Sequence, residues 1–238
     1  MQKLSGQWYF HRFGKTYKVG TYKGMDLSFG KGELAVGGIL IRAITSVGAI
    51  NGKHLPLDDF IEGPCNTVTR ILEHNSPDPA SPIKEVKDFV VLDNFSTDAF
   101  KEGTRLFLSR ISDSDRATLK LPWLPARTPL YRGPRVGLTL KRFDEHKVRY
   151  WLRDYRFVAY PERHRKMQIL VMLGMLGASH RLSPVDVVRT CKTKAATVDE
   201  LKTEMDKGLK SDKKIDSFRE VDMKTKDFAF AFGVHQAT

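Results

Sequence analysis

Seven glycines divide the stretch from Trp8 to Ala43 into short runs of aromatic and β-branched residues, at positions 14, 20, 24, 30, 32, 37 and 38. Glycine accepts the backbone angles that tight turns need, and short β-prone runs between glycines are typical of hairpins. A chain that turns back so often is restricted to antiparallel strands. The best predicted strand in this stretch runs from Gly38 to Ile44.

The remaining chain carries signals for both helices and strands. Proline, capping or apolar-periodicity signals predict helices at 65–73, 161–177, 186–191 and 197–207. Runs of β-prone residues predict further short strands at 89–92, 135–140 and 147–160. The sequence therefore predicts an α+β fold with a mostly antiparallel sheet. We place an α+β domain at residues 1–182 and a helical, charged extension at 183–238.

The charge of the chain is strongly positive, with a formal net charge of +12 from 40 basic and 28 acidic residues. Residues 184–238 contain 11 Lys and Arg against 10 Asp and Glu, so the excess belongs to the first part of the chain. Nucleic acid and acidic lipid headgroups are partners that such a surface suits, and solubility alone is the third explanation.

The cysteines and the apolar runs exclude several classes of protein. Cys65 and Cys191 are far apart and lack a Cys-x-x-Cys or nearby histidine spacing, so we predict neither a disulfide framework nor a metal site. The most apolar run, Ile169–Ala178, has about half the length that spans a bilayer. No nucleotide-binding fingerprint is present, and we expect no secretory signal. We expect a monomer in the nucleus or cytoplasm, with no cofactor and no membrane partner.

Aromatic and cationic side chains interleave between Trp8 and Lys23, and the first 25 residues contain no carboxylate. This mixture suits a surface that holds phosphates and stacks on bases or wedges between them. In a strand every second residue faces the opposite side, so the alternative is that the rings face the core and the cations face water. The residues are Trp8, Tyr9, Phe10, His11, Arg12, Phe13, Lys15, Tyr17, Lys18, Tyr22 and Lys23.

Arg42 lies at the end of an apolar strand, where a buried guanidinium needs a carboxylate, a phosphate or carbonyl groups as partners. A structural ion pair and a binding pocket are the two alternatives for it. Gly63-Pro64 at a helix start offers backbone N–H groups to an anion, a weak signal because many helices begin in this way.

Four segments, taken in order, resemble the later part of the alkyladenine (3-methyladenine) DNA glycosylase family. They are Tyr22–Phe29, Gly37–Ala43, Glu62–Leu72 and Pro134–Tyr160. In that family a Tyr-rich strand ending in Tyr-Gly-Met precedes a strand ending in Leu-Arg-Ala, a Gly-Pro helix and an Arg-Val-Gly segment. The resemblance spans about residues 17 to 160. It implies one domain with a curved, mostly antiparallel sheet flanked by helices.

The resemblance also implies a function, which is to bind duplex DNA, wedge a side chain into the minor groove and flip a damaged purine into a pocket. Arg42 matches the family's pocket arginine, and the backbone around Val136 matches the segment that holds the attacking water. Tyr22 or Lys23 matches the wedging tyrosine, depending on a one-residue shift. The predicted DNA contacts are Tyr17, Lys18, Tyr22, Lys23, Met25, Arg135 and Lys141.

The chain departs from the family at the catalytic glutamate, which lies before the Tyr-rich strand and deprotonates water. Here no acidic residue precedes Asp26. Three explanations are open: an N-terminal segment is absent from this sequence, the pocket no longer hydrolyses, or Asp26 or Glu33 serves as the base.

The leading hypothesis is a base-excision-repair protein, glycosylase-like, that binds damaged duplex DNA, with hydrolysis of the N-glycosidic bond open. The alternatives are a non-catalytic nucleic-acid-binding protein of the same fold, or a basic protein-interaction module that uses the tail from Thr197 to Phe232.

Overall fold

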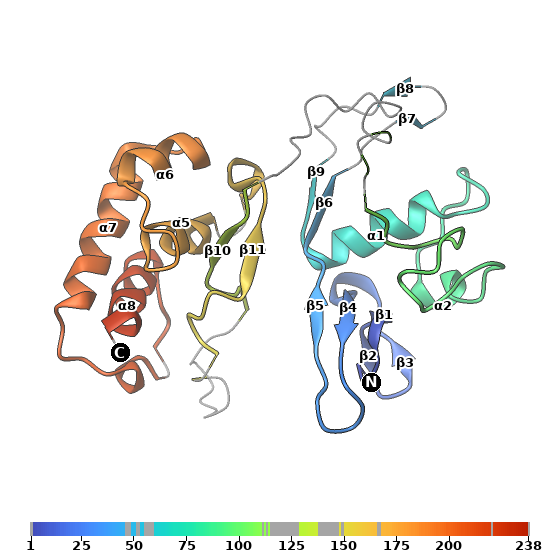
Figure 1. Ribbon diagram of the computed structural model, residues 1–238, viewed down its shortest axis with the longest axis horizontal. Helices are drawn as coiled ribbons and strands as arrows, with labels where there is room; N and C mark the ends of the chain where they lie inside the picture. Colours follow the sequence, from blue (N-terminus) through green and yellow to red (C-terminus); the bar gives the residue numbers. More distant parts are fainter. Residues whose placement is uncertain are drawn as a thin grey trace. The chain divides into compact units, whose positions relative to one another are not determined.

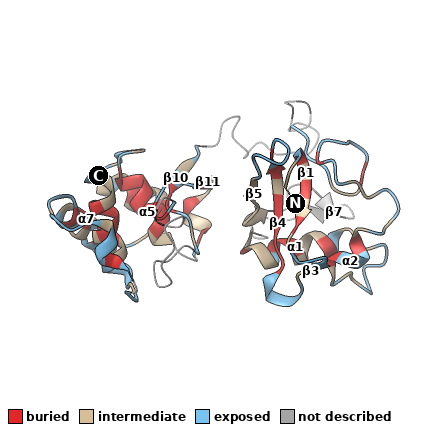
Figure 2. Ribbon diagram, turned by 90° about the horizontal axis from the view of Figure 1, so that it is seen from below, coloured by how far each residue is buried: buried red, intermediate tan, exposed pale blue. Residues whose placement is uncertain are grey.

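The computed structural model forms two compact units, Met1–Pro125 and Ala126–Thr238. It describes residues 2–45, 49–50, 53–54, 60–110, 112, 114, 129–137, 148, 150–165, 168–219 and 221–237. Each unit has its own hydrophobic core (Figures 1 and 2). The boundary that the sequence analysis placed at residue 182 falls inside the second unit.

A three-stranded antiparallel sheet forms the centre of the first unit. Its strands are β1 (Ser5–Phe10), β4 (Met25–Phe29) and β5 (Gly38–Leu40), in the order β1-β4-β5. Trp8 and Phe10 alternate along β1 with residues that are less buried, and Phe10 lies opposite Met25 of β4. This alternation directs one face of the sheet into the core.

The other elements of the first unit are short. Two small sheets pair β6 (Ala43–Thr45) with β9 (Phe60–Glu62) and β7 (Ala49–Ile50) with β8 (Lys53–His54). A hairpin pairs β2 (Arg12–Phe13) with β3 (Thr16–Tyr17), and a 3-10 turn, η1, covers Gly20–Tyr22. The helices are α1 (Pro64–His74) and α2 (Val86–Phe89).

The core of the first unit joins these helices to the sheet. Val68 and Leu72 of α1 and Phe89 of α2 are fully buried with Phe10 and Met25. The ring of Phe89 meets the rings of Phe10 and Phe95 edge-on, which is a preferred geometry for aromatic pairs. The apolar face of α1 is therefore what holds the helix to the strands.

Among its described residues, the second unit has a two-stranded antiparallel sheet and four α-helices around a core of its own. Its elements are β10 (Tyr131–Gly133), β11 (Arg156–Val158), η2 (Pro161–Arg163), α5 (Gln168–Leu176), α6 (Pro184–Cys191), α7 (Ala195–Leu209), η3 (Ile215–Phe218) and α8 (Thr225–Ala237). Helix α5 is buried from Leu170 to Leu176, and it packs against β10 and the other helices. This buried helix accounts for the apolar run Ile169–Ala178, which is too short to span a membrane.

Helices α7 and α8 cross at two glycines. A Cβ atom added at Gly208 would lie 2.0 Å from the carbonyl oxygen of Phe230, and one at Gly233 would lie 2.0 Å from that of Met205. Only glycine permits such close approach of two helix backbones. These two residues therefore fix how α8 covers α7.

Within the described residues the fold is α+β, with six α-helices and small antiparallel sheets. No described helix has the length and apolar character that crossing a membrane requires. Both cysteines, Cys65 and Cys191, are free.

Several predicted elements were wrong in type or extent. The expected strand 89–92 is the end of helix α2 and a turn, and the expected strand 38–44 is interrupted at Ile41 and Arg42. Helix α7 begins at Ala195, so Thr197 lies inside it and is not its N-cap. Phe218, in the segment between α7 and α8, is buried in the core. Local patterns failed here because packing in the core overrides propensity.

Candidate nucleic-acid interface

The candidate interface is the segment Arg12–Tyr22, which leaves β1, turns back as the β2–β3 hairpin and ends in η1. Gly14 takes a left-handed backbone conformation with φ 57° in the hairpin turn, which a glycine adopts without strain. After the hairpin, the amide of Lys18 donates to the carbonyl of His11 at 2.9 Å. The turn and this hydrogen bond hold the segment against the end of the central sheet.

Large apolar side chains of this segment are exposed to solvent. Phe13 is 85% exposed, Tyr22 76% and Val19 52%. Arg12 and Lys15 are exposed and Lys18 is half-buried, and the first 25 residues contain no carboxylate. Trp8 and Phe10 are buried, as the core interpretation of the interleaved residues predicts, whereas Phe13 and Tyr22 lie at the surface.

Arg12 and Tyr17 form a pair on the hairpin. The guanidinium carbon lies 4.2 Å from the centre of the Tyr17 ring, and the guanidinium also hydrogen-bonds to the tyrosine hydroxyl. A cation above an aromatic face is attracted by the ring's electron density. The pair orders both side chains while the charge of Arg12 stays at the surface.

The two residues that compete for the wedge position have different environments. Lys23 is only 9% exposed, and its Nζ donates to the carbonyl of Lys84 at 3.2 Å. Tyr22, by contrast, projects into solvent from η1, so it is the residue able to enter a groove. Met25 is 2% exposed in the core between sheet and helices, so it is not placed to touch nucleic acid as the sequence analysis expected.

Asp26 lies on β4 with two donors around its carboxylate. His11 Nε2 lies 3.0 Å from Asp26 Oδ1, and the Gln2 amide donates to Oδ2. The side chains of Asp26 and His11 are 11% and 28% exposed. A carboxylate beside an imidazole is a pair that can take up and release protons. No local motif in the sequence marks this pair, because it depends on the antiparallel pairing of β1 with β4.

Arg42 connects the central sheet to the β6–β9 sheet and to α1. It lies between β5 and β6, is half-buried, and its carbonyl accepts a hydrogen bond from the Gly63 amide at 2.7 Å. Gly63 is the N-cap of α1. The predicted Gly-Pro helix start is thus tied to the backbone of the predicted pocket arginine, although these residues are 21 positions apart in sequence.

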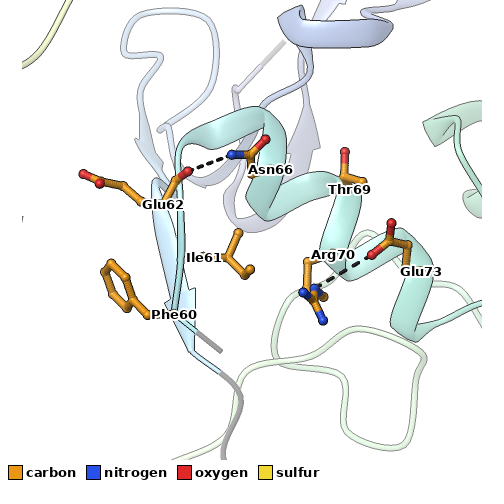
Figure 3. Close-up of a pocket in the computed structure, with 7 residues that line it drawn as sticks. All are labelled: Phe60, Ile61, Glu62, Asn66, Thr69, Arg70 and Glu73. Carbon is orange, nitrogen blue, oxygen red and sulfur yellow. Dashed lines mark hydrogen bonds and ion pairs between the residues drawn. The ribbon is translucent and has the colours of Figure 1, made fainter. Parts of the chain in front are cut away.

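A hollow of about 330 Å³ lies over β9 and α1 (Figure 3). Two polar contacts join residues that line it: Asn66 Nδ2 donates to the Glu62 carbonyl at 3.0 Å, and Arg70 Nε lies 3.8 Å from Glu73 Oε2. The lining residues are Phe60, Ile61, Glu62, Asn66, Thr69, Arg70 and Glu73. Neither Arg42 nor Asp26 is among them, so the described part of the chain does not place the two predicted catalytic side chains in this hollow.

The remaining predicted residues belong to the second unit or lie outside the described residues. Arg135 is exposed after β10, and Val136 is half-buried against the second core. Lys141 lies outside the described residues. In the parts of the chain that the structure describes, no group of three or more His, Cys, Asp or Glu side chains could hold a metal ion.

The chain is similar to "Uncharacterized protein L759" of Acanthamoeba polyphaga mimivirus, with 31% identity over 178 residues, which cover 69% of this chain and 68% of that protein. No protein-family model matches the chain. No solved structure matches it.

Proposed function

This chain belongs to the same family as the mimivirus protein L759, and we propose that it binds duplex DNA through the segment Arg12–Tyr22 of its first unit. The observation that carries the proposal is the pairing of exposed Phe13 and Tyr22 with cations in a stretch free of carboxylates. Bases offer flat faces on which exposed aromatic side chains stack, and neighbouring cations hold the phosphates between those bases.

The charge arrangement supports a polyanion over an acidic protein or a lipid surface. Arg12, Lys15 and Lys18 follow one another within seven positions, and the first acidic residue, Asp26, is buried with its own donors. A repeating row of phosphates matches closely spaced cations, and the aromatic side chains between them match bases. Lys15 and Lys18 contact phosphates in this proposal, and Tyr22 enters the minor groove.

The finer part of the proposal is a glycosylase-like role, with a curved sheet and the recognition of a modified purine that is flipped out of the stack. The order of the four resembling segments supports it, and Tyr22 supplies the wedge. The pair of His11 and Asp26 supports a second candidate activity, hydrolysis of the N-glycosidic bond. In this role Asp26 would accept a proton from water, and His11 would orient the carboxylate.

The test of binding is fluorescence anisotropy on a short duplex over a range of salt concentrations. Tyr22→Ala should weaken binding by about 1–3 kcal/mol, the usual loss of one stacked base. Lys18→Ala should lower the slope of log K against log salt by about 1. Leu34→Ala is the matched control, because Leu34 is fully exposed in the same unit. Equal effects of Tyr22→Ala and Leu34→Ala would show that the segment does not bind DNA.

The test of damage recognition uses the same duplex with one ethenoadenine or hypoxanthine. Tighter binding to the damaged duplex, reduced in Tyr22→Ala and Arg42→Ala, supports the flipped-purine role. Abasic sites detected by alkali cleavage, and lost in Asp26→Asn, support hydrolysis. Affinity that is blind to the lesion would leave a non-catalytic DNA-binding protein.

A further inference from the structure

Helices α6 and α7 of the second unit are joined by a turn of three residues, Lys192, Thr193 and Lys194. Lys192 adopts the left-handed conformation, with φ 49° and ψ 48°, and its amide donates to the carbonyl of Val188. Figure 1 shows α6 crossing the N-terminal end of α7, and the two helices are in contact. Two helices joined at a steep angle by such a short turn are the helix-turn-helix arrangement.

The buried residues of the two helices have the spacing that fixes this arrangement. Val187 and Cys191 on α6, and Val198 and Leu201 on α7, all enter the core of the second unit, where α5 is buried beside them. On its other side α7 packs against α8 at the two glycines. What is left exposed at the start of α7 is its first turn, with Ala195 and Ala196.

The charge around this exposed turn is positive. Residues 187–198 contain three cations, Arg189, Lys192 and Lys194, and no carboxylate, and all three cations are exposed. Of the neighbouring acids, Glu200 lies 2.6 Å from Lys226 Nζ, Asp186 is paired with Arg189, and Asp199 is exposed. Lys192 and Lys194 are therefore the cations of this turn that remain for a phosphate backbone.

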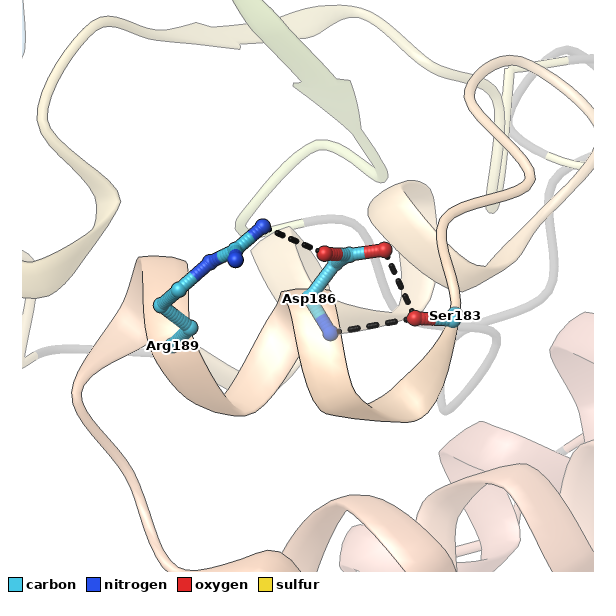
Figure 4. Close-up of polar contacts among 3 residues, drawn as sticks. All are labelled: Ser183, Asp186 and Arg189. Atoms are coloured by element: carbon cyan, nitrogen blue, oxygen red, sulfur yellow. Dashed lines mark hydrogen bonds and ion pairs between the residues drawn. The ribbon is translucent and has the colours of Figure 1, made fainter.

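The two helix starts differ in how their amides are capped. At α6, Ser183 Oγ accepts a hydrogen bond from the Asp186 amide at 3.1 Å and donates one to the Asp186 carboxylate at 2.7 Å. The guanidinium of Arg189 lies 2.5 Å from Oδ1 of the same carboxylate (Figure 4). At α7 the N-cap is Lys194, whose side chain cannot accept a hydrogen bond. The first turn of α7 thus combines a positive helix end with two lysines and small side chains.

We propose that α6, the turn 192–194 and α7 form a DNA-binding helix-turn-helix, with the first turn of α7 in the major groove of duplex DNA. Lys192 and Lys194 contact phosphates on the groove edge, and the small Ala195 and Ala196 let the helix approach the bases. Asp199, exposed one turn later, is placed to accept a hydrogen bond from a cytosine amino group. This inference rests on residues of the second unit and is independent of the segment Arg12–Tyr22.

The test uses the full chain with the double substitution Lys192→Gly and Lys194→Gln. Glycine suits the left-handed turn better than lysine, so this variant removes two charges without weakening the fold. The control is Lys210→Gln with Lys214→Gln, an equal change of charge at the far end of α7, where both lysines are exposed. Thermal unfolding checks that both variants are folded.

If both turn lysines contact phosphates, the slope of log K against log salt falls by about 1.8, which corresponds to roughly 30-fold weaker binding near 0.15 M salt. The control pair should change affinity much less. Dimethyl sulfate should find guanine N7 atoms, which face the major groove, protected in the wild-type complex and exposed in a complex with Ala196→Glu.

Equal effects of the two lysine pairs, unchanged N7 protection in Ala196→Glu, or no binding of duplex DNA by the full chain would each overturn the proposal. The Tyr22→Ala variant separates the two interfaces: it should weaken binding while it leaves the N7 protection pattern in place. A loss of N7 protection in Tyr22→Ala at saturating protein would also count against an independent helix-turn-helix.

Discussion

Gly233→Ala should destabilise the second unit, although alanine is the better helix former. The added Cβ would lie 2.0 Å from the Met205 carbonyl oxygen and 2.9 Å from the Leu209 amide nitrogen, where ordinary contact begins at 3.4 Å. The difference between 2.0 and 3.4 Å means that α8 would have to move away from α7 by about 1.4 Å. The obstacle is helix backbone, which cannot turn aside as a side chain can.

The magnitude follows from two opposing effects. Alanine in place of glycine gains about 1 kcal/mol in helix propensity. Overpacking against backbone costs about 3 kcal/mol, the upper end of the usual range, because Phe232 and Val234 beside Gly233 are already fully buried and cannot shift outward. The expected net loss is about 2 kcal/mol in the free energy of unfolding.

Hydrogen exchange measured by mass spectrometry suits this prediction, because it reports the two units separately. Amides of α7 should exchange about 30-fold faster in Gly233→Ala, while those of β1 and β4 keep their rates. Thr203→Ala is the control: Thr203 is exposed on α7, so the substitution gains helix propensity without a clash. Slower exchange in Gly233→Ala, as in the control, would refute the close crossing of α7 and α8.

Three further outcomes are expected. Burial raises the pKa of the Cys191 thiol to about 11, so iodoacetamide near neutral pH should label Cys65 in the folded chain and Cys191 only after denaturation, as peptide mass spectrometry will show. Burial, and then a neighbouring arginine, lowers the pKa of His180 and of His235 below the ordinary value of 6.5. Because the unfolded chain then binds more protons than the folded chain, the melting temperature of the second unit should fall as pH is lowered from about 8 to about 5. A melting temperature that does not depend on pH would contradict this. Lys192→Gly alone should raise the stability of the second unit by a few tenths to about 1 kcal/mol in urea unfolding, because it relieves a left-handed side-chain residue.

Local signals in the sequence were sufficient to predict an element where its own capping or turn residues mark where it begins and ends. The helices predicted at 65–73, after Gly63-Pro64, and at 186–191 are both confirmed as α1 and α6. The antiparallel character of the first strands followed from the glycine spacing and is also confirmed. These elements are defined by capping and turn residues, whose effect is local.

The sequence could not predict what depends on contacts between distant segments. Phe89 was assigned to a strand because its neighbours are β-prone, but it is packed against Phe10 and Phe95 at the end of a short helix. The pairing of His11 with Asp26 needed the register of β1 on β4. The turn between α6 and α7 depends on the left-handed Lys192, a conformation that a lysine rarely adopts and that no sequence motif marks.

Asp26→Asn separates a structural role of the carboxylate from a catalytic one. The substitution leaves one oxygen and replaces the other with an amide group, which has to face either His11 or Gln2, both donors in the wild-type chain. His11 can accommodate the amide by moving its ring proton to Nδ1 and accepting at Nε2. We therefore expect a loss of stability of no more than about 1 kcal/mol and a new imidazole tautomer, visible in nitrogen NMR shifts.

If the pair only supports the sheet, Asp26→Asn will bind damaged and undamaged duplexes like the wild-type chain. If Asp26 is the general base, the variant will keep its affinity for the damaged duplex and lose the abasic product, since an amide cannot take a proton from water. A large loss of stability would show instead that both donors require the charged carboxylate, because a buried donor without an acceptor costs about 1–3 kcal/mol. Only the second result would make the pair a catalytic one.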